Sequence, residues 1–102
     1  MEGSPLKQLQ TAVLASLTEQ QRETTFTERA LFLATETGEV QKEVLKFLGC
    51  YGDAEAEHAK ARIAKELCDV IWNACQLATQ LHLELDEPMD ALLQYNLGRK
   101  YW

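Results

Sequence analysis

Apolar residues recur along the chain at steps of three and four positions, and runs that alternate strictly between apolar and polar residues are absent. Residues three and four apart share one face of an α-helix, so this periodicity is typical of amphipathic helices. The pattern predicts an all-α fold, a four-helix bundle with two long central helices. The short connection between these two helices favours antiparallel packing.

Two helices are expected in the first half of the chain. The first starts near Pro5, a residue favoured at the first helical position, and ends in the polar stretch TEQQRETT. The second is opened by Thr25 or Thr27 as N-cap and stops at Gly49, which can take the left-handed conformation at a helix end. Their apolar positions are Leu6, Leu9, Val13, Leu14 and Leu17 in the first helix, and Phe26, Ala30, Leu33, Val40, Val44 and Leu48 in the second.

The other two helices follow a short turn with the sequence GCYGD. Asp53 is expected to cap the longer of them, which extends over roughly 25 to 30 residues. Asp86, followed by Glu87 and Pro88, predicts the cap of the last helix. Their apolar positions are Ile63, Leu67, Val70, Ala74, Leu77 and Leu81 in the third helix, and Met89, Leu92, Leu93 and Tyr95 in the last.

The length of 102 residues predicts a single domain. A domain of this size buries only about two-thirds of the surface that its unfolded chain exposes, so association would stabilise it. The last helix and the terminal Tyr101 and Trp102 are too apolar to remain in water. We therefore expect a homodimer or homotetramer.

The charge balance excludes several kinds of partner. Ten Lys and Arg residues stand against sixteen Asp and Glu residues, which gives a net charge of −6. Phosphate backbones and anionic lipids repel such a domain, so we expect that it binds neither nucleic acid nor membrane.

The three cysteines are odd in number, which disfavours a disulfide framework. Cys68 and Cys75 fall within a helical pattern and are expected to be buried as small apolar groups. The N-terminus has no basic stretch followed by an apolar segment, and no apolar run approaches the ~20 residues that cross a bilayer. These features, with Cys50 also unpaired, predict a cytoplasmic protein with reduced thiols.

Two pairs of acidic residues lie at helical spacing on the two central helices. Glu36 and Glu39 are three positions apart, as are Glu66 and Asp69, so each pair shares a face with Cβ atoms about 5–6 Å apart. Acidic residues at this spacing arise by chance in so acidic a chain. At about 100° per residue, however, both pairs border the apolar face of their helix. The same borders carry Glu43, Arg62 and Asn73.

Antiparallel packing of the central helices would bring the four carboxylates into one cleft. Two carboxylates about 6 Å apart repel by roughly 3 kcal/mol at an effective dielectric constant of about 20. Such a cleft must therefore bind protons, Arg or Lys side chains, or a metal. Carboxylate oxygens select hard ions such as Mg²⁺ or Mn²⁺, which substrate phosphates often complete. The alternative is a solvated acidic strip, paired in part with Arg62, Lys65, Lys42 and Arg29.

Three neighbouring side chains each allow more than one interpretation. Trp72 and Phe32 could stack on a base, although packing at a helix or subunit interface is the commoner role of such aromatic residues. Asn73 could orient a ligand carboxylate, read a base, or form a hydrogen bond between helices. Glu55 and His58 raise the alternative of a di-iron site, but that site needs a second Glu-x-x-His pair, which the chain lacks.

The segments LATETGEVQKEVLK and AKELCDVIWNACQLA resemble the paired signature of the MazG-like, all-α nucleoside triphosphate pyrophosphohydrolases. In that family a Glu-x-x-Glu helix and a Glu-x-x-Asp helix together hold Mg²⁺. The run YNLGRKY is similar to the family's Asn-containing segment, with Asn96 followed by the basic Arg99. The likeness extends over residues 28–101, and it implies one MazG-like domain over residues 1–102. Cys68 departs from the small Gly that is common in the second motif.

The resemblance implies Mg²⁺-dependent hydrolysis, with Mn²⁺ as a possible substitute, of a (d)NTP between its α- and β-phosphates. The products are a nucleoside monophosphate and pyrophosphate, as in housekeeping of the nucleotide pool. Carried over by position, the metal ligands and catalytic carboxylates would be Glu36, Glu39, Glu66 and Asp69. Asn96 and Arg99, and more weakly Lys100, would contact the sugar or the phosphates. The competing hypothesis is a non-catalytic helical bundle that binds a protein partner through its last helix.

Overall fold

The computed structural model describes residues 4–98, and within them it contains five helices and no strand. The prediction of an all-α fold is confirmed. The helices are α1 (Pro5–Ser16), α2 (Glu19–Arg22), α3 (Phe26–Leu48), α4 (Asp53–Gln80) and α5 (Asp86–Leu97). The short α2 lies in the polar stretch for which no helix was predicted. No helix of the described residues is both long and apolar enough to cross a membrane.

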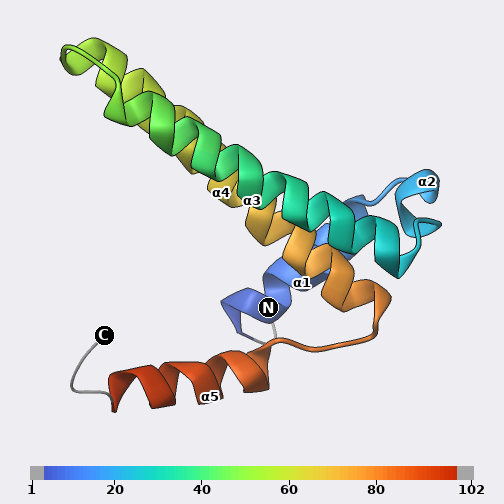
Figure 1. Ribbon diagram of the computed structural model, residues 1–102. Coiled ribbons are helices and arrows are strands. Elements are labelled where there is room, and N and C mark those ends of the chain that lie inside the picture. Colours follow the sequence, from blue (N-terminus) through green and yellow to red (C-terminus); the bar gives the residue numbers. More distant parts are fainter. Residues whose placement is uncertain (1–3, 99–102) are drawn as a thin grey trace.

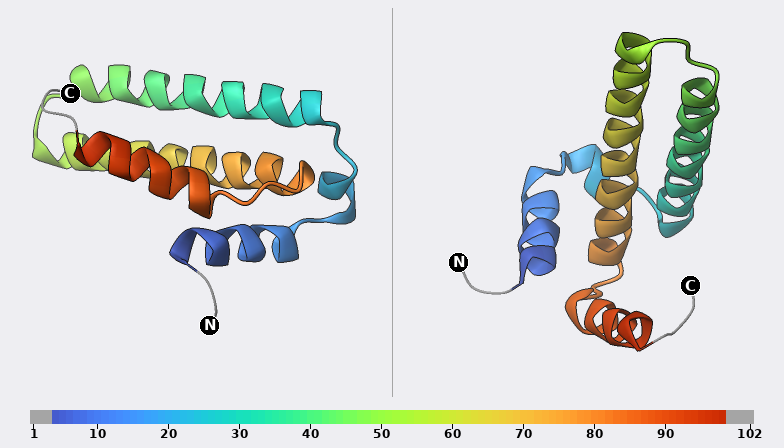
Figure 2. Two further views of the ribbon diagram at one scale, coloured as in Figure 1. Left: turned by 90° about the horizontal axis from the view of Figure 1, so that it is seen from below. Right: turned by 90° about the vertical axis from the view of Figure 1, so that its left-hand side faces the viewer.

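The two longest helices, α3 and α4, form a hairpin. They lie side by side and run in opposite directions, with the connection between them at the far end of the molecule (Figures 1 and 2). At the other end, Gln80 Nε2 donates a hydrogen bond to the backbone oxygen of Thr24 at 2.6 Å. The 28 residues of α4 agree with the predicted length. The hairpin therefore places the borders of the two central helices against each other.

Helix α1 packs against the second half of α4 and makes the small core of the molecule. Val13 and Leu17 of α1 are buried against Cys75 of α4, and Leu6 and Leu85 pack against this cluster. Cys75 is thus buried as predicted. Cys68, expected to be buried as well, is exposed.

Helix α5 leaves the hairpin and extends away from it (Figure 1). None of its residues is buried. Its starting point is fixed by Gln10 of α1, whose Nε2 donates to the backbone oxygen of Leu83 at 2.9 Å and whose Oε1 accepts from Leu85 N at 3.0 Å. Ser4 Oγ also donates a hydrogen bond to Asp86, and Lys7 pairs with Glu84 at 3.4 Å. The described chain consists of a hairpin, a supporting helix and a projecting helix.

The helix ends agree with the sequence at two places and differ at three. Thr25 caps α3, with Glu28 completing a capping box, and α1 begins at Pro5 as expected. Gly49 has a φ of −92°, so the predicted left-handed conformation is wrong there; the chain reverses at Gly52, with a φ of 94°. Asp53 and Asp86 are the first residues of their helices and not the caps. Their charges favour the helix N-termini all the same, because the helix dipole is positive there.

Several apolar positions of α3 that the pattern assigns to a packed face have no cover in the single chain. Phe26, Val44 and Leu48 leave 54%, 37% and 73% of their surface exposed. All three lie on the same side of α3, next to the line of contact with α4. The periodicity identified the face correctly, but the described chain supplies no helix to cover it.

Candidate metal centre

Charged side chains line one edge of the contact between α3 and α4. On α3, Glu36 and Glu43 are seven residues apart, which is about two helical turns, so both lie on the same stripe. On α4, the same edge carries Arg62, Glu66 and Asp69, which follow each other at steps of four and three residues. Because the helices are antiparallel, the two stripes face each other, with Arg62 opposite Glu43 and with Glu66 and Asp69 opposite Glu36. The sequence pattern that borders the core thus becomes a polar seam.

Three carboxylates of this seam converge. One oxygen from each of Glu36, Glu66 and Asp69 lies within 4.8 Å of the others, and all three residues are half-buried. Three oxygen ligands at this separation can coordinate one hard divalent cation, which would keep water or phosphate oxygens at its remaining positions. Within residues 4–98, this is the group of side chains whose donor chemistry fits Mg²⁺ or Mn²⁺.

The convergence changes the electrostatics of Glu36. Burial raises the pKa of the Glu36 carboxyl group above its usual value, and the negative charges of Asp69 and Glu66 raise it further. The carboxyl group of Glu66 also forms a hydrogen bond that contributes to this rise in the pKa of Glu36. Burial and the two neighbouring negative charges therefore both disfavour the charged form of Glu36.

A lysine partly balances the group. Lys65 Nζ lies 2.9 Å from Asp69 Oδ2 and 3.6 Å from Glu66 Oε1. The ammonium group is mostly exposed, so it can move away into solvent without breaking any core packing. One cation opposite three carboxylates leaves the group with net negative charge. The sequence predicted that such a cleft must take up protons, basic side chains or metal, and the structure shows a basic side chain, Lys65, in this position.

A fourth acid of the seam is fully balanced. The buried Glu43 accepts a hydrogen bond from Arg62 Nε at 2.8 Å and pairs with Lys46 at 3.4 Å. The hydrogen bond from Arg62 is the main reason why the pKa of Glu43 is lowered. The angular position of Glu43 predicted that it borders the apolar face of its helix. The basic Arg62 opposite it on α4 is the signal that identifies Glu43 as a structural residue.

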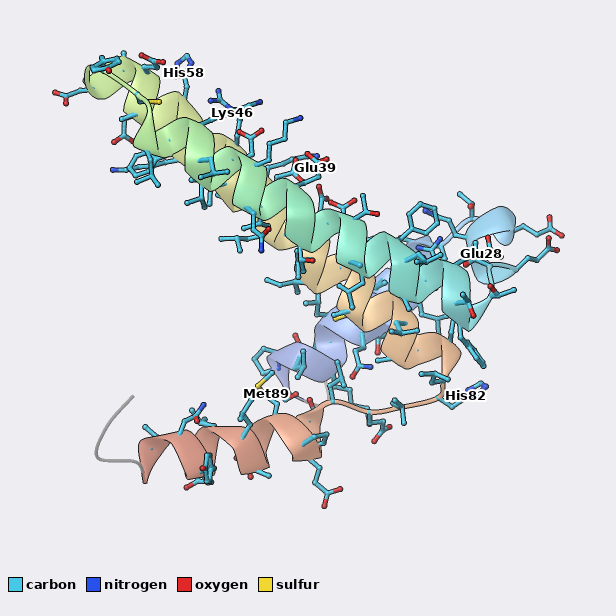
Figure 3. The ribbon with its side chains drawn as sticks, in the orientation of Figure 1. Glu28, Glu39, Lys46, His58, His82 and Met89 are labelled. Atoms are coloured by element: carbon cyan, nitrogen blue, oxygen red, sulfur yellow. The ribbon has the colours of Figure 1, made fainter. Side chains whose placement is uncertain are left out.

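Glu39, the fourth predicted ligand, lies outside the converging group. It is half-buried on α3, three residues after Glu36. Figure 3 shows it on the same edge of the hairpin as Lys46. At about 100° per residue, Glu39 points further from α4 than Glu36 does. The described structure therefore brings together three of the four predicted ligands.

The predicted partners of the substrate occupy two different regions. Asn73 Nδ2 donates to the backbone oxygen of Asp69 at 2.8 Å, within α4, so the alternative of a hydrogen bond between helices is wrong. Trp72 and Phe32 are partly exposed, and the guanidinium group of Arg29 lies 4.7 Å from the centre of the Phe32 ring. These aromatic side chains retain surface that a base could contact.

The last helix is remote from the acidic group within one chain. Asn96 is half-buried near the end of α5, which lies on the side of the hairpin away from Glu39 (Figure 3). Arg99 and Lys100 lie outside the described residues, as do Tyr101 and Trp102. The single chain does not bring Asn96 to the three carboxylates.

Arg29 differs from its expected role. It was expected to pair with the acidic strip, but no ion pair between Arg29 and a carboxylate occurs within residues 4–98. Its Nε donates to Thr24 Oγ1 at 2.8 Å, and burial lowers its pKa. Arg29 is two helical turns from Glu36, so it lies beyond the reach of the acidic group.

Comparisons with known proteins add no relative. No protein-family model, curated protein or solved structure matches the chain.

Proposed function

We propose that the chain is a Mg²⁺-dependent pyrophosphohydrolase that cleaves nucleoside triphosphates between the α- and β-phosphates. The observation that supports this function is the convergence of Glu36, Glu66 and Asp69 within 4.8 Å. These are three of the four positions that the resemblance to MazG-like enzymes marks as metal ligands. The proposed role is housekeeping of the nucleotide pool, in the cytoplasm, where thiols such as the three free cysteines stay reduced.

The reaction needs charge neutralisation and positioning more than covalent catalysis, because charge spreads over the phosphoryl oxygens in the transition state. Mg²⁺ held by the three carboxylates would supply this neutralisation and lower the pKa of a bound water. Hydrolysis breaks one P–O bond of the α–β bridge and adds the elements of water to the two products. A carboxylate at the edge of the group accepts the proton of the attacking water, and Glu39 lies on this edge.

The remaining substrate contacts are assigned as proposals. Asn73 and Trp72 follow Asp69 on α4 and would lie beside the sugar and the base. Asn96, Arg99 and Lys100 would contact the sugar or the phosphates from a neighbouring copy, because α5 is remote from the acidic group of its own chain. The proposed enzyme is accordingly a homo-oligomer.

A panel of dNTPs and NTPs with Mg²⁺ tests the activity, with the products separated by ion-exchange chromatography. Nucleoside monophosphate and pyrophosphate are expected from the wild-type chain. Glu66→Gln is expected to abolish their formation, whereas Glu57→Gln, which changes an exposed acid on the same helix, is expected to preserve it. Release of inorganic phosphate and a nucleoside diphosphate, or full activity of Glu66→Gln, contradicts the proposal.

Thermal melting provides an independent measure of metal binding. At a free Mg²⁺ concentration of about ten times the dissociation constant, a site in the folded state adds roughly 1.4 kcal/mol of stability. If the melting temperature does not rise and no nucleotide is hydrolysed, the alternative is a non-catalytic helical module. The exposed α5, with no buried residue, is the observation that favours this alternative.

A further inference from the structure

The stripe of α4 that contains Asp69 carries different chemistry on its two sides. Lys65, Asp69, Trp72 and Gln76 follow each other at steps of four, three and four residues, so they share one side of the helix. Lys65 precedes Asp69, towards the connection with α3, and the other two follow it, towards the open end of the hairpin. At 1.5 Å per residue, the stripe extends over about 16 Å along the helix axis. It is therefore long enough to contact both ends of an extended nucleotide.

The half of this edge towards the connection is basic. Lys46 and Arg62 both pair with the buried Glu43. Lys65 Nζ lies 2.9 Å from Asp69 Oδ2, and 69% of the lysine side chain is exposed. Among these three cations, Lys65 is the one that can change partner without leaving a buried charge unpaired. When a divalent ion neutralises Asp69, the phosphate oxygens of a bound nucleotide become the stronger partners of the ammonium group.

The half towards the open end is aromatic. Trp72 on α4 and Phe32 on α3 leave 36% and 48% of their surface exposed. Phe32 lies four residues before Glu36 and therefore on the acidic edge of its helix. Exposed aromatic rings are surfaces on which a base stacks. The guanidinium group of Arg29 is buried and packs on the Phe32 ring at 4.7 Å, so it offers no accessible charge to phosphates.

Gln76 is an independent observation that points to a polar ligand in the aromatic half. Its side chain is 1% exposed, and within residues 4–98 neither its amide nitrogen nor its amide oxygen has a hydrogen-bond partner. The amide oxygen of Gln80, one turn further along α4, also lacks a partner among these residues. Buried polar atoms without partners are costly. The edge of a base carries both donors and acceptors, which are the two kinds of partner that these amides lack.

We propose that a nucleoside triphosphate lies along this edge in one direction, with its terminal phosphates at Lys65 and its base against Phe32 and Trp72, beside Gln76. The inference rests on the proposed function, and it adds the direction of the substrate and a phosphate ligand. After hydrolysis, pyrophosphate lies at Lys65 and the nucleoside monophosphate at the aromatic residues. The reverse direction would place the most negative part of the substrate beside aromatic rings, and the base beside an exposed ammonium group.

Inhibition by the two products tests this direction on the full chain, at a constant free Mg²⁺ concentration. Lys65→Gln is expected to weaken inhibition by pyrophosphate about tenfold, through loss of a charge-assisted hydrogen bond, and to leave inhibition by nucleoside monophosphate unchanged. Trp72→Ala is expected to weaken inhibition by nucleoside monophosphate about tenfold, through loss of stacking, and to leave inhibition by pyrophosphate unchanged. Lys60→Gln and Tyr51→Ala are the matched controls, because both side chains are exposed away from the acidic group.

A second measurement distinguishes a phosphate ligand from a lysine that only repels the metal. Loss of repulsion alone would tighten the binding of both Mn²⁺ and pyrophosphate in Lys65→Gln. The proposal expects tighter Mn²⁺ and weaker pyrophosphate, measured by calorimetric titration. Lys65→Arg keeps the charge and is expected to restore inhibition by pyrophosphate. Phe32→Ala takes the place of Trp72→Ala if circular dichroism shows that the tryptophan variant is unfolded.

The possible failures have different meanings. Exchanged effects of the two variants, equal effects on both products, or no effect of either variant overturns the proposed direction. Hydrolysis by wild type with unaltered product inhibition in Lys65→Gln contradicts this inference alone. Failure of wild type to hydrolyse any nucleotide contradicts the proposed function, and the inference with it.

Discussion

The seam between α3 and α4 contains two acidic sites, two helical turns apart, whose charges are balanced differently. One is Glu43, and the other is the group of Glu36, Glu66 and Asp69. Glu43 is buried and has Arg62 at 2.8 Å and Lys46 at 3.4 Å. Glu36, by contrast, lies with Glu66 and Asp69 and has only Lys65 to share with them. The pKa of Glu43 is lowered and that of Glu36 is raised.

The difference shows that an acidic residue at a helix interface does not by itself indicate a metal site. Glu36 and Glu43 occupy equivalent positions on the same stripe, but the charges around them differ: Glu36 has two carboxylates as neighbours, and Glu43 has two basic side chains. Arg62 closes the Glu43 pair with a direct hydrogen bond, which stabilises the hairpin. The other group retains unbalanced charge that a divalent ion can neutralise.

The largest expected effect is a difference in nucleotide hydrolysis between substitutions at Glu36 and at Glu43. Glu36→Gln removes a predicted metal ligand and should lower kcat/KM for nucleotide hydrolysis about 100-fold or more. Glu43→Gln removes the ion pairs with Arg62 and Lys46 but no predicted metal ligand, and should leave hydrolysis nearly unchanged. Steady-state kinetics at saturating Mg²⁺ measure both. Equal losses in the two variants would show that the seam acts as one unit.

A smaller effect is expected from Lys65, whose ammonium group lies beside the acidic group. Lys65→Gln removes the competitor for Asp69 and should tighten Mn²⁺ binding about three- to tenfold, as expected for one charge near ~5 Å in a mostly aqueous setting. Lys60→Gln is the matched control, because Lys60 pairs with Glu57 elsewhere on α4. Calorimetric titration of the chain with Mn²⁺ gives both affinities. Unchanged affinity in Lys65→Gln would mean that the lysine is only a surface group.

In metal-free buffer, Glu43→Gln should have a larger effect on thermal stability than Glu36→Gln. Glu43→Gln weakens the hydrogen bond with Arg62 and should lower the melting temperature by several degrees. Glu36→Gln removes repulsion from Asp69 and Glu66 and should leave the melting temperature unchanged or slightly raised. Calorimetric scans of the two variants beside wild type test this, and a loss in Glu36→Gln larger than in Glu43→Gln contradicts it.

The smallest effect is a difference in pH dependence. Glu36 has a pKa raised from 4.5, so it holds a proton in the folded chain that the unfolded chain has already lost; its contribution to stability falls as pH rises above 4.5. Glu43 has a pKa lowered from 4.5, so its contribution is present above 4.5 and is lost as pH falls through the lowered value. Urea unfolding of wild type, Glu36→Gln and Glu43→Gln across this range should give opposite slopes for the two differences.

The residues of the acidic group could be predicted because they depend on local rules. Helical periodicity gave the face of each residue, and the short turn between the long helices gave their direction. These two facts suffice to bring Glu36 near Glu66 and Asp69. The position of the Glu39 side chain could not be predicted in this way, since a side chain further from the contact line can point along the edge or out to solvent.

The direction of α5 could not be predicted in the same way. It depends on contacts of Gln10 with Leu83 and Leu85, more than seventy positions further along the chain, and no local pattern announces them. The predicted contacts of Asn96 depend on this direction. Likewise, the apolar pattern identified Val44 and Leu48 as a packing face but not which chain supplies the cover.

Gln10 of α1 forms two hydrogen bonds at the start of α5, so the position of α1 determines the direction of the last helix. Helix α5 has 12 residues and is therefore about 18 Å long. A small tilt at its anchored root moves its far end by several times the displacement at Gln10. Substitutions in the first helix can thus reposition Asn96 without touching α5 itself.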